Sequence, residues 1–294
     1  MKLKQILALT LALSMGLALC ACGASNTAQT AAETVEEVTE PETSEPLEAA
    51  TINVFIAASL AGCFEDIVAL YAASQPNVTV QLNPDSSGKL LTQIEEGYEC
   101  DVFFSASTKQ INTLDEEGLM IDGSRVDLLE NVLSVITWKG SGTAVTTLAE
   151  VDKAASLALA DASVPAGNYT RVALNALGIL DDPAADTAAV STALGGVEIN
   201  ECSNVSAVKE AIKEHSNEVG TVYYSDAYSI KDDIDVIELV STDLTGEVVY
   251  PVCRVVNDSA TDAVAAAADD FLAFLQTPEV LAIYEEYMFV IHAG

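Results

Sequence analysis

The stretch Thr51-Ile-Asn-Val-Phe-Ile-Ala-Ala-Ser-Leu60 decides the fold of this chain. Its first seven residues are β-branched or apolar apart from one Asn, a composition that predicts a buried β-strand. Ser59 can cap a helix that begins at Leu60, and apolar residues then recur at helical spacing as far as Ala73. A strand, a turn with a hydroxyl side chain and a helix together form the repeating unit of an α/β protein.

The same unit recurs along the rest of the chain. Apolar runs predict further strands at 78–82, 101–105, 132–137, 157–160, 220–223 and 248–256. Helical spacing, with Pro or Gly at several ends, predicts helices at 89–96, 165–177, 205–215, 260–275 and 278–287. Strands that alternate with helices predict largely parallel sheets covered on both faces. A length of 294 residues fits one large domain or two medium ones.

Three more strand-to-helix turns carry hydrogen-bond donors. They are Asp85-Ser-Ser-Gly88, in which Ser87 can cap the next helix, Val164-Pro-Ala-Gly167 and Cys202-Ser-Asn204. Each turn offers free backbone N–H groups at the positive end of a helix, and such turns lie at the carboxyl ends of strands, where α/β proteins bind ligands. Four helix N-termini could together hold an anion, although Ser and Asn also cap helices that bind nothing.

In their order and spacing these segments resemble the substrate-binding proteins of molybdate ABC importers, across nearly all of residues 51–294. The most specific parts are the opening Ile52–Leu60 and the turn Val164-Pro-Ala-Gly-Asn-Tyr169, which are distinctive together and weak alone. The other matching segments are Asp85–Ile94, Asp101–Ala106, Gly220–Ala227 and Tyr250–Val252.

The resemblance implies a two-lobed fold of the type II periplasmic-binding-protein class. Each lobe is expected to be a mainly parallel sheet flanked by helices, and a two-stranded hinge joins the lobes. The first lobe would comprise residues 51–132 plus 246–294, and the second residues 133–245. The ligand would lie in the cleft between them.

The resemblance also implies five ligand-binding residues. Ser59 and Ser87 would donate hydroxyl hydrogens, Ala166 and Val205 backbone N–H groups, and Tyr223 its phenol hydrogen. The ligand would be molybdate or tungstate, and no cofactor is implied. Both ions are fully deprotonated dianions that only accept hydrogen bonds, so a site rich in neutral donors suits them.

Asp85 departs from the family pattern, in which a small neutral residue is common at this position. A carboxylate facing the cleft would favour a protonated oxyanion such as monohydrogen phosphate, whereas a carboxylate that starts the turn and faces solvent would leave the molybdate hypothesis intact. Sulfate and phosphate therefore stay open as alternative ligands.

A ferric-ion binder of the same architecture is a further alternative, because Tyr223, Tyr224 and the nearby Tyr228 could supply phenolate ligands. Against it, neighbouring residues of a strand point to opposite faces. An enzyme is disfavoured, since the two histidines, His215 and His292, lie in a polar helix and near the C-terminus, and no candidate base accompanies Ser59 in the sequence.

The N-terminus resembles a bacterial lipoprotein signal. Lys2 and Lys4 precede an apolar run at 6–19 that is too short to span a membrane comfortably. The run ends in Leu19-Cys-Ala-Cys-Gly23, where Cys22 fits the lipidation position, so residues 1–21 would be a cleaved signal peptide. An ordinary secretory signal with incidental cysteines is the alternative.

Residues 22–50 are expected to form an acidic, disordered tether. Positions 24–50 hold seven acidic residues, no basic residue and no large aromatic side chain, and such a segment cannot bury enough apolar surface to fold. Signal, lipid anchor and tether together place the chain on the extracytoplasmic face of the cell membrane. Its expected partners are the permease and ATPase subunits of an ABC importer, and the protein itself is expected to be a monomer.

The formal charge of the chain is −33, from 12 basic and 45 acidic residues. This excess of acid argues against nucleic acid as a partner, because phosphate backbones are bound by Lys and Arg. Residues 51–294 keep 38 acidic and 10 basic residues, a formal charge of −28. That charge suggests a cation as ligand, which conflicts with the neutral, donor-rich site, and we take the charge to concern solubility instead.

Overall fold

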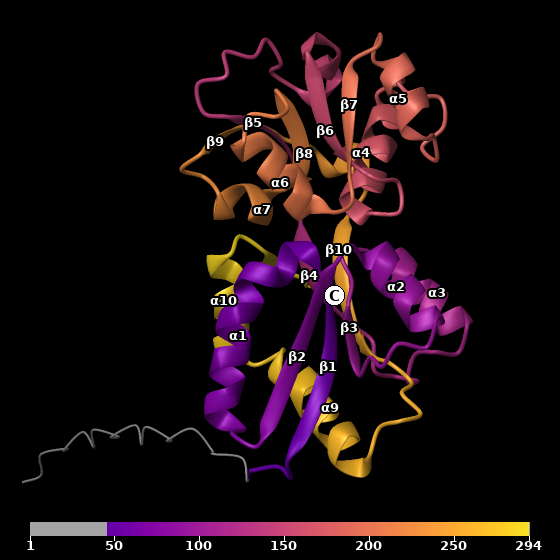
Figure 1. Cartoon of the computed structure of the whole chain (residues 1–294), viewed down its shortest axis with the longest axis vertical. Coiled ribbons are helices and arrows are strands. Elements are labelled where there is room, and N and C mark those ends of the chain that lie inside the picture. The colour runs from indigo at the N-terminus through magenta and orange to yellow at the C-terminus, as the bar shows by residue number, and fades with distance from the viewer. Residues whose placement is uncertain (1–45, 294) are drawn as a thin grey trace, which may run out of the picture. The chain divides into compact units, whose positions relative to one another are not determined.

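Two β-sheets form the centre of the chain in the computed structural model, which describes residues 46–293 (Figure 1). The first sheet has six strands, in the order β11 (Val290–Ile291), β4 (Val126–Asn131), β10 (Val248–Arg254), β3 (Val102–Phe104), β1 (Ala50–Ala57) and β2 (Val78–Asp85). The second sheet has five, in the order β7 (Glu198–Cys202), β6 (Ser156–Ala160), β8 (Val219–Tyr223), β5 (Leu133–Trp138) and β9 (Ile234–Leu239).

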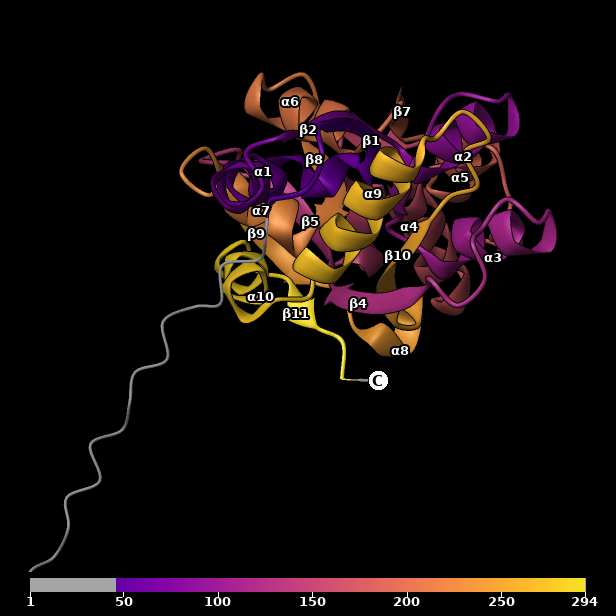
Figure 2. The ribbon, with the colours of Figure 1, turned by 90° about the horizontal axis from the view of Figure 1, so that it is seen from below.

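Helices flank both sheets, as expected for an α/β fold. Around the first sheet lie η1 (Ala58–Leu60), α1 (Ala61–Ser74), α2 (Ser87–Glu95), α3 (Thr108–Glu116), α9 (Asp262–Phe274) and α10 (Pro278–Glu286). The second sheet is accompanied by η2 (Leu148–Lys153), α4 (Pro165–Ala176), α5 (Thr187–Ala193), α6 (Val205–Lys213), α7 (Tyr224–Ser229) and α8 (Thr242–Thr245). In Figure 2, α1 and α10 lie on one side of the first sheet and α2 and α3 on the other.

Both sheets are mixed, which corrects the expectation of mainly parallel ones. β1 runs parallel to β2 and β3, and β6 runs parallel to β7 and β8. In contrast, β10 is antiparallel to β3 and β4, and β5 is antiparallel to β8 and β9. The reason is the path of the chain: β5 and β10 enter their sheets from the junction between the lobes, whereas β1, β2, β6 and β8 run toward it.

The chain crosses between the sheets twice, and the two crossings form the two-stranded hinge. β4 pairs with β10 as far as Asn131 opposite Val248, and β5 begins two residues later at Leu133, opposite Tyr223. Only Val132 lies between the two sheets on this strand. We propose that the lobes have the boundaries expected from the sequence, 51–132 plus 246–294 and 133–245.

The predicted signal peptide at 1–21, the lipidation site Cys22 and the tether up to residue 45 lie outside the described residues. The end of the tether is corrected, however, because β1 already begins at Ala50, which pairs with Val78. The Leu47 N–H also donates to Gln75 Oε1 at 3.0 Å, and the Leu47 side chain packs against the core. Across residues 46–293, no helix is both long and apolar enough to span a membrane.

Candidate functional site

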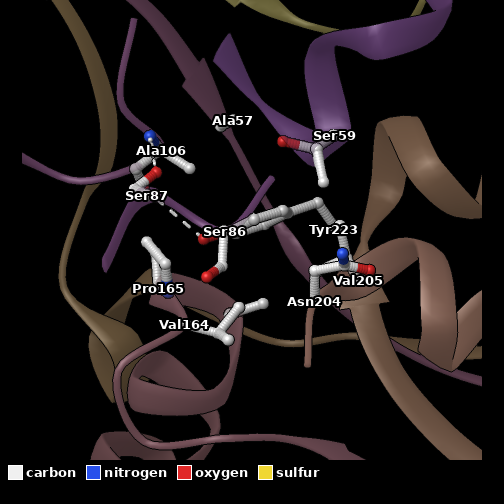
Figure 3. Close-up of a pocket in the computed structure, with 12 residues that line it drawn as sticks. Ala57, Ser59, Ser86, Ser87, Ala106, Val164, Pro165, Asn204, Val205 and Tyr223 are labelled. Atoms are coloured by element: carbon white, nitrogen blue, oxygen red, sulfur yellow. Dashed lines mark hydrogen bonds between the residues drawn. The ribbon is translucent and has the colours of Figure 1, made fainter. Parts of the chain in front are cut away.

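A small cavity lies between the two lobes, where the carboxyl ends of β1, β2, β6 and β8 meet (Figure 3). Its volume is about 10 Å³, the space of about one water molecule. Residues from both lobes line it, and none of them carries a charged side chain. They are Ala57, Ala58, Ser59, Ser86, Ser87, Ala106, Val164, Pro165, Ala166, Asn204, Val205 and Tyr223.

All five residues proposed from the sequence lie in this lining. Ser59 and Ser87 come from the first lobe, and Ala166, Val205 and Tyr223 come from the second. The structure therefore brings them to one place, while their role as donors to a ligand stays a prediction. The sequence reasoning did not assign the remaining lining residues to the site, although five of them belong to the strand-to-helix turns that it singled out, namely Ala58, Ser86, Val164, Pro165 and Asn204.

Ser87 does not cap its helix, in contrast to the sequence expectation. α2 begins two residues earlier than predicted, so Ser86 is the N-cap and its Oγ accepts the Lys89 N–H at 3.4 Å. The Ser87 side chain is fully buried, and its Oγ accepts the Ala106 N–H at 3.0 Å. Because the hydroxyl oxygen is occupied by a protein donor, its hydrogen is available to an acceptor in the cavity.

Ser59 is also not a cap. It lies inside the short turn η1, and neither η1 nor α1 has a side chain bonded to its N-terminal N–H groups. The Ser59 hydroxyl instead lies 3.0 Å from the hydroxyl of Tyr250, a fully buried residue of β10. The predicted caps were wrong for the same reason at both turns: the helix starts one or two residues away from the expected position, which leaves the hydroxyl at the cavity.

The second lobe contributes two helix starts. Ala166 occupies the first turn of α4 behind Pro165, and Val205 is the first residue of α6. Backbone N–H groups in the first turn of a helix have no acceptor within the helix. Asn204 caps α6, since its Oδ1 accepts the Ala207 N–H at 2.9 Å. Two helix N-termini, with the positive ends of their dipoles, therefore face the cavity.

The turn before α4 is held in place by a close backbone approach. A side chain at Gly167 would put its Cβ 2.3 Å from the Ala160 carbonyl oxygen, so only glycine fits there. Arg171 of the same helix is fully buried, and its guanidinium donates to the carbonyl oxygens of Ala160 and Gly167, both at 2.9 Å. These bonds satisfy carbonyls at the turn and fix α4 against the end of β6.

Tyr223 ends β8 and is the one aromatic residue in the lining. Its hydroxyl donates to the Ala106 carbonyl oxygen at 3.5 Å, a long bond that crosses between the lobes (dashed in Figure 3). Burial raises the pKa of Tyr223 well above its ordinary value, and the neighbouring Tyr250 and Tyr169 raise it further. The phenol therefore stays protonated and can act as a donor.

Asp85 lies outside the cavity lining, at the end of β2, and its side chain is 26% exposed. Its Oδ1 accepts the Ser86 N–H at 2.7 Å and, from the other lobe, the Asn204 side-chain amide at 3.2 Å. The Lys89 ammonium lies 3.7 Å from the same oxygen. The carboxylate thus links the lobes beside the cavity and adds no negative charge to its lining.

Apart from Tyr223 and Ser59, the residues behind the alternative functions lie outside the cavity lining. Tyr224 begins α7 and is absent from the lining, and the ammonium of Lys231 lies 3.8 Å from the ring centre of Tyr228. His215 stacks on Trp138 at 4.3 Å, and His292 Nδ1 lies 2.7 Å from Glu130. Within residues 46–293, no group of three or more His, Cys, Asp and Glu side chains is arranged to hold a metal ion.

Residues 52–290 match the family described as bacterial extracellular solute-binding protein. The chain is 26% identical over 240 residues to YvgL of Bacillus subtilis (strain 168), which is named as a candidate ABC transporter substrate-binding lipoprotein, and the match covers 81% of this chain and 86% of that protein. It is 30% identical over 253 residues to the molybdate-binding protein ModA of Escherichia coli (strain K12), with 82% and 89% of the two chains covered.

Among solved structures, the periplasmic molybdate-binding protein of Azotobacter vinelandii has the same fold. The TM-score is 0.67 at 21% sequence identity, and the match covers 82% of this chain and 99% of that one. At this identity the likeness concerns the fold.

Proposed function

We propose that this chain, which belongs to the bacterial extracellular solute-binding protein family, captures molybdate or tungstate between its two lobes and delivers it to a membrane permease. Family membership makes it a solute-binding protein of an ABC transporter and not an enzyme. Its place is therefore extracytoplasmic, and its partners are the permease and ATPase subunits of an importer.

The observation that carries the proposal is the chemistry of the cavity lining. Ser59, Ser87, Ala166, Val205 and Tyr223 line one small space, and each has a hydroxyl or backbone N–H group that could donate to a ligand. No carboxylate and no ammonium lines it. A lining with several neutral donors and no charged side chain suits an ion that only accepts hydrogen bonds, and hydrogen bonds to a charged acceptor are the strong ones.

The same chemistry ranks the ligands. Monohydrogen phosphate carries a proton that needs an acceptor, and the nearby Asp85 carboxylate is bonded to Ser86 and Asn204 outside the lining. A ferric ion needs anionic ligands, whereas the raised pKa of Tyr223 opposes its ionisation. Sulfate is the closest alternative, because it too is fully deprotonated. Relatives named as molybdate-binding proteins favour molybdate over sulfate.

Binding is expected to proceed by hinge closure. The ligand would meet donors from both lobes, so it stabilises the closed arrangement that brings those donors together. A tetrahedral oxyanion is larger than one water molecule, and the cavity holds about 10 Å³. The lobes must therefore separate to admit the anion before they close around it.

We also propose that the mature protein is a monomer anchored through a lipid on Cys22, with the acidic segment that follows acting as a spacer. The lipobox-like sequence and the description of YvgL as a lipoprotein support this. The substitution Cys22→Ser should release the protein from the membrane fraction, and a Cys22→Ser protein that still fractionates with membranes would contradict the proposal.

Calorimetric titration of the purified chain with sodium molybdate, tungstate, sulfate and phosphate, and with ferric ion, tests the function. We expect molybdate and tungstate to bind at least tenfold more tightly than sulfate or phosphate, a difference of about 1.4 kcal/mol or more. Binding of ferric ion without any oxyanion would overturn the proposal, and tighter binding of sulfate would change the ligand while keeping the site.

A further inference from the structure

We propose that Tyr250 and Asn131, which lie behind the cavity and not in its lining, orient the Ser59 hydroxyl so that its hydrogen is presented to the cavity. This orientation would select fully deprotonated oxyanions over protonated ones. The inference rests on the proposed function, and it adds two positioning residues to the five that line the cavity.

The orientation of the Asn131 amide is the first step. Asn131 ends β4 at the hinge and is 3% exposed. Its Oδ1 accepts the backbone N–H of Val132 at 2.8 Å, which identifies the other end of the amide as the donor. That Nδ2 group lies 2.9 Å from the Ser225 hydroxyl and 3.3 Å from the Tyr250 hydroxyl. Its two hydrogens therefore go to these two oxygens.

The Tyr250 hydroxyl is the second step. Its oxygen accepts a hydrogen from Asn131, so its own hydrogen must go to another oxygen. Ser59 Oγ lies at 3.0 Å. Tyr250 is fully buried, and this burial raises the pKa of its phenol well above the ordinary value, which keeps the hydrogen on the oxygen. Tyr250 is therefore assigned as the donor of this hydrogen bond and Ser59 as its acceptor.

Ser59 is the third step and ends the chain of hydrogen bonds from Asn131 through Tyr250 to Ser59, which we call the relay. Its oxygen accepts from Tyr250, and its own hydrogen is left for the cavity that it lines. Ser87 has the same arrangement by a different route, since its oxygen accepts the Ala106 N–H at 3.0 Å. A hydroxyl oxygen has two lone pairs, and in each of these two serines a protein donor takes up one of them, so the hydroxyl hydrogen is not needed for that contact and is left for the cavity.

This orientation matters for the choice of ligand. Molybdate, tungstate and sulfate accept hydrogen bonds on all their oxygens, so whichever oxygen faces Ser59 can accept its hydrogen. Monohydrogen phosphate has one hydroxyl group, and if that group faces Ser59, one of the two facing hydroxyl hydrogens stays without an acceptor. An unpaired buried hydrogen costs free energy, and the relay therefore penalises the protonated ion.

The substitution Tyr250→Phe tests the relay, because it removes the phenol hydroxyl and keeps the ring that packs on Tyr223 and Phe289. Asn131 keeps its bond to Ser225. We expect the Kd for molybdate to rise roughly tenfold, as the Ser59 hydroxyl is no longer oriented toward the cavity. The Kd for monohydrogen phosphate should not rise, so the ratio of the two constants should narrow roughly tenfold.

A double-mutant cycle shows whether Tyr250 acts through Ser59. In a Ser59→Ala background, Tyr250→Phe should have no further effect on the Kd for molybdate. Tyr284→Phe is the matched control, since Tyr284 is an equally buried phenol against Phe289 whose hydroxyl has no hydrogen-bond partner among residues 46–293. It should leave both dissociation constants unchanged.

Three results would overturn the relay, and they differ from a failure of the proposed function. If Tyr250→Phe raised the Kd for molybdate and the Kd for phosphate equally, the role of Tyr250 would be merely structural. Additive effects in the double mutant would mean that Tyr250 does not act through Ser59. Tighter molybdate binding by Tyr250→Phe would mean that Ser59 donates to Tyr250. A wild-type protein that binds no oxyanion overturns the proposed function, and the relay with it.

Discussion

Ser87 lines the cavity, and its hydroxyl does not cap α2 because the neighbouring Ser86 does. Ser87→Ala removes a buried donor that faces the proposed anion. We expect it to weaken molybdate binding by about 1–3 kcal/mol, the cost of leaving a charged acceptor one donor short. Calorimetric titration measures this loss directly.

Ser134 provides the matched control for that experiment. It is another fully buried serine, but it lies in β5, donates to the Val222 carbonyl oxygen at 3.0 Å and is absent from the cavity lining. Ser134→Ala should lower the free energy of unfolding without changing the Kd for molybdate. If Ser87→Ala changed the Kd no more than Ser134→Ala does, the assigned site would be wrong.

Asp226 is a buried carboxylate of α7, and the Lys209 ammonium lies 3.1 Å from its Oδ1. Burial raises the pKa of Asp226 above its ordinary value of 3.8, and the attraction of Lys209 only partly opposes this. The folded state therefore binds this proton more tightly than the unfolded state. The stability contributed by the group is complete below the unfolded pKa and is lost as the pH rises through the folded pKa.

Asp226→Asn removes this titration. The free energy of unfolding of the wild type should therefore fall relative to that of the variant as the pH is raised from 3.8 through the folded pKa. Urea unfolding of both proteins over that pH range gives the difference. A difference that stays constant with pH would show that the carboxylate does not change its protonation there.

At the scale of elements, helix α2 contacts the other lobe through a glycine. A Cβ at Gly88 would lie 2.4 Å from the Ser163 carbonyl oxygen, which belongs to the turn before α4. Gly88→Ala should thus hold the cleft wider than the ligand requires. We expect roughly tenfold weaker molybdate binding, about 1.4 kcal/mol, measured by calorimetry.

This substitution should not destabilise the first lobe, because alanine favours a helix more than glycine does, by up to about 1 kcal/mol. An unchanged or higher melting temperature without ligand would therefore show that the added methyl group acts by holding the lobes apart and not by impairing folding. Thr92→Ala, at an exposed position of the same helix, is the control and should leave the affinity unchanged. Unchanged affinity in Gly88→Ala would show that the lobes do not need this close approach.

The two edge strands of the second sheet show which elements could not be predicted from the sequence. β7 and β9 lie at its two edges, and most of their side chains are exposed or half-buried. Their sequences, Glu-Ile-Asn-Glu-Cys and Ile-Asp-Val-Ile-Glu-Leu, lack the continuous apolar run that marked the central strands. An edge strand is stabilised by pairing with its neighbour, and that pairing is a long-range property.

For the whole molecule, the charge of −28 in residues 51–294 opposes the approach of an anion. Added salt screens this repulsion, since the Debye length falls to about 10 Å at 0.1 M. The association rate of molybdate should therefore rise with ionic strength. Stopped-flow fluorescence of Trp138 can follow it, because this is the single tryptophan of the chain.

The salt effect should appear mainly in association and less in dissociation, because the lining of the cavity carries no charged side chain. Potassium chloride suits the titration, since chloride is not a tetrahedral oxyanion. An association rate that falls with salt would mean that a local positive field outweighs the net negative charge of residues 51–294. Lys89 and Lys209 are the candidate sources of such a field.

The sequence by itself determined the α/β class, most of the central strands, and the turns at or beside which Ser59, Ser87, Ala166 and Val205 lie. These features are local, because apolar runs, helix-start residues and turn residues act within a few positions of one another. A strand order or a ligand cannot be obtained in this way, and the resemblance to a known family supplied both the two lobes and the list of donors.

Only the tertiary structure decided how those donors are held. The bond between Asp85 and Asn204 joins residues 119 positions apart, and the bond between Ser59 and Tyr250 joins residues 191 apart. Whether a serine caps a helix or points into a cavity depends on where the helix starts after packing. Such contacts arise when the two lobes and the returning strand β10 meet, so no local pattern in the sequence records them.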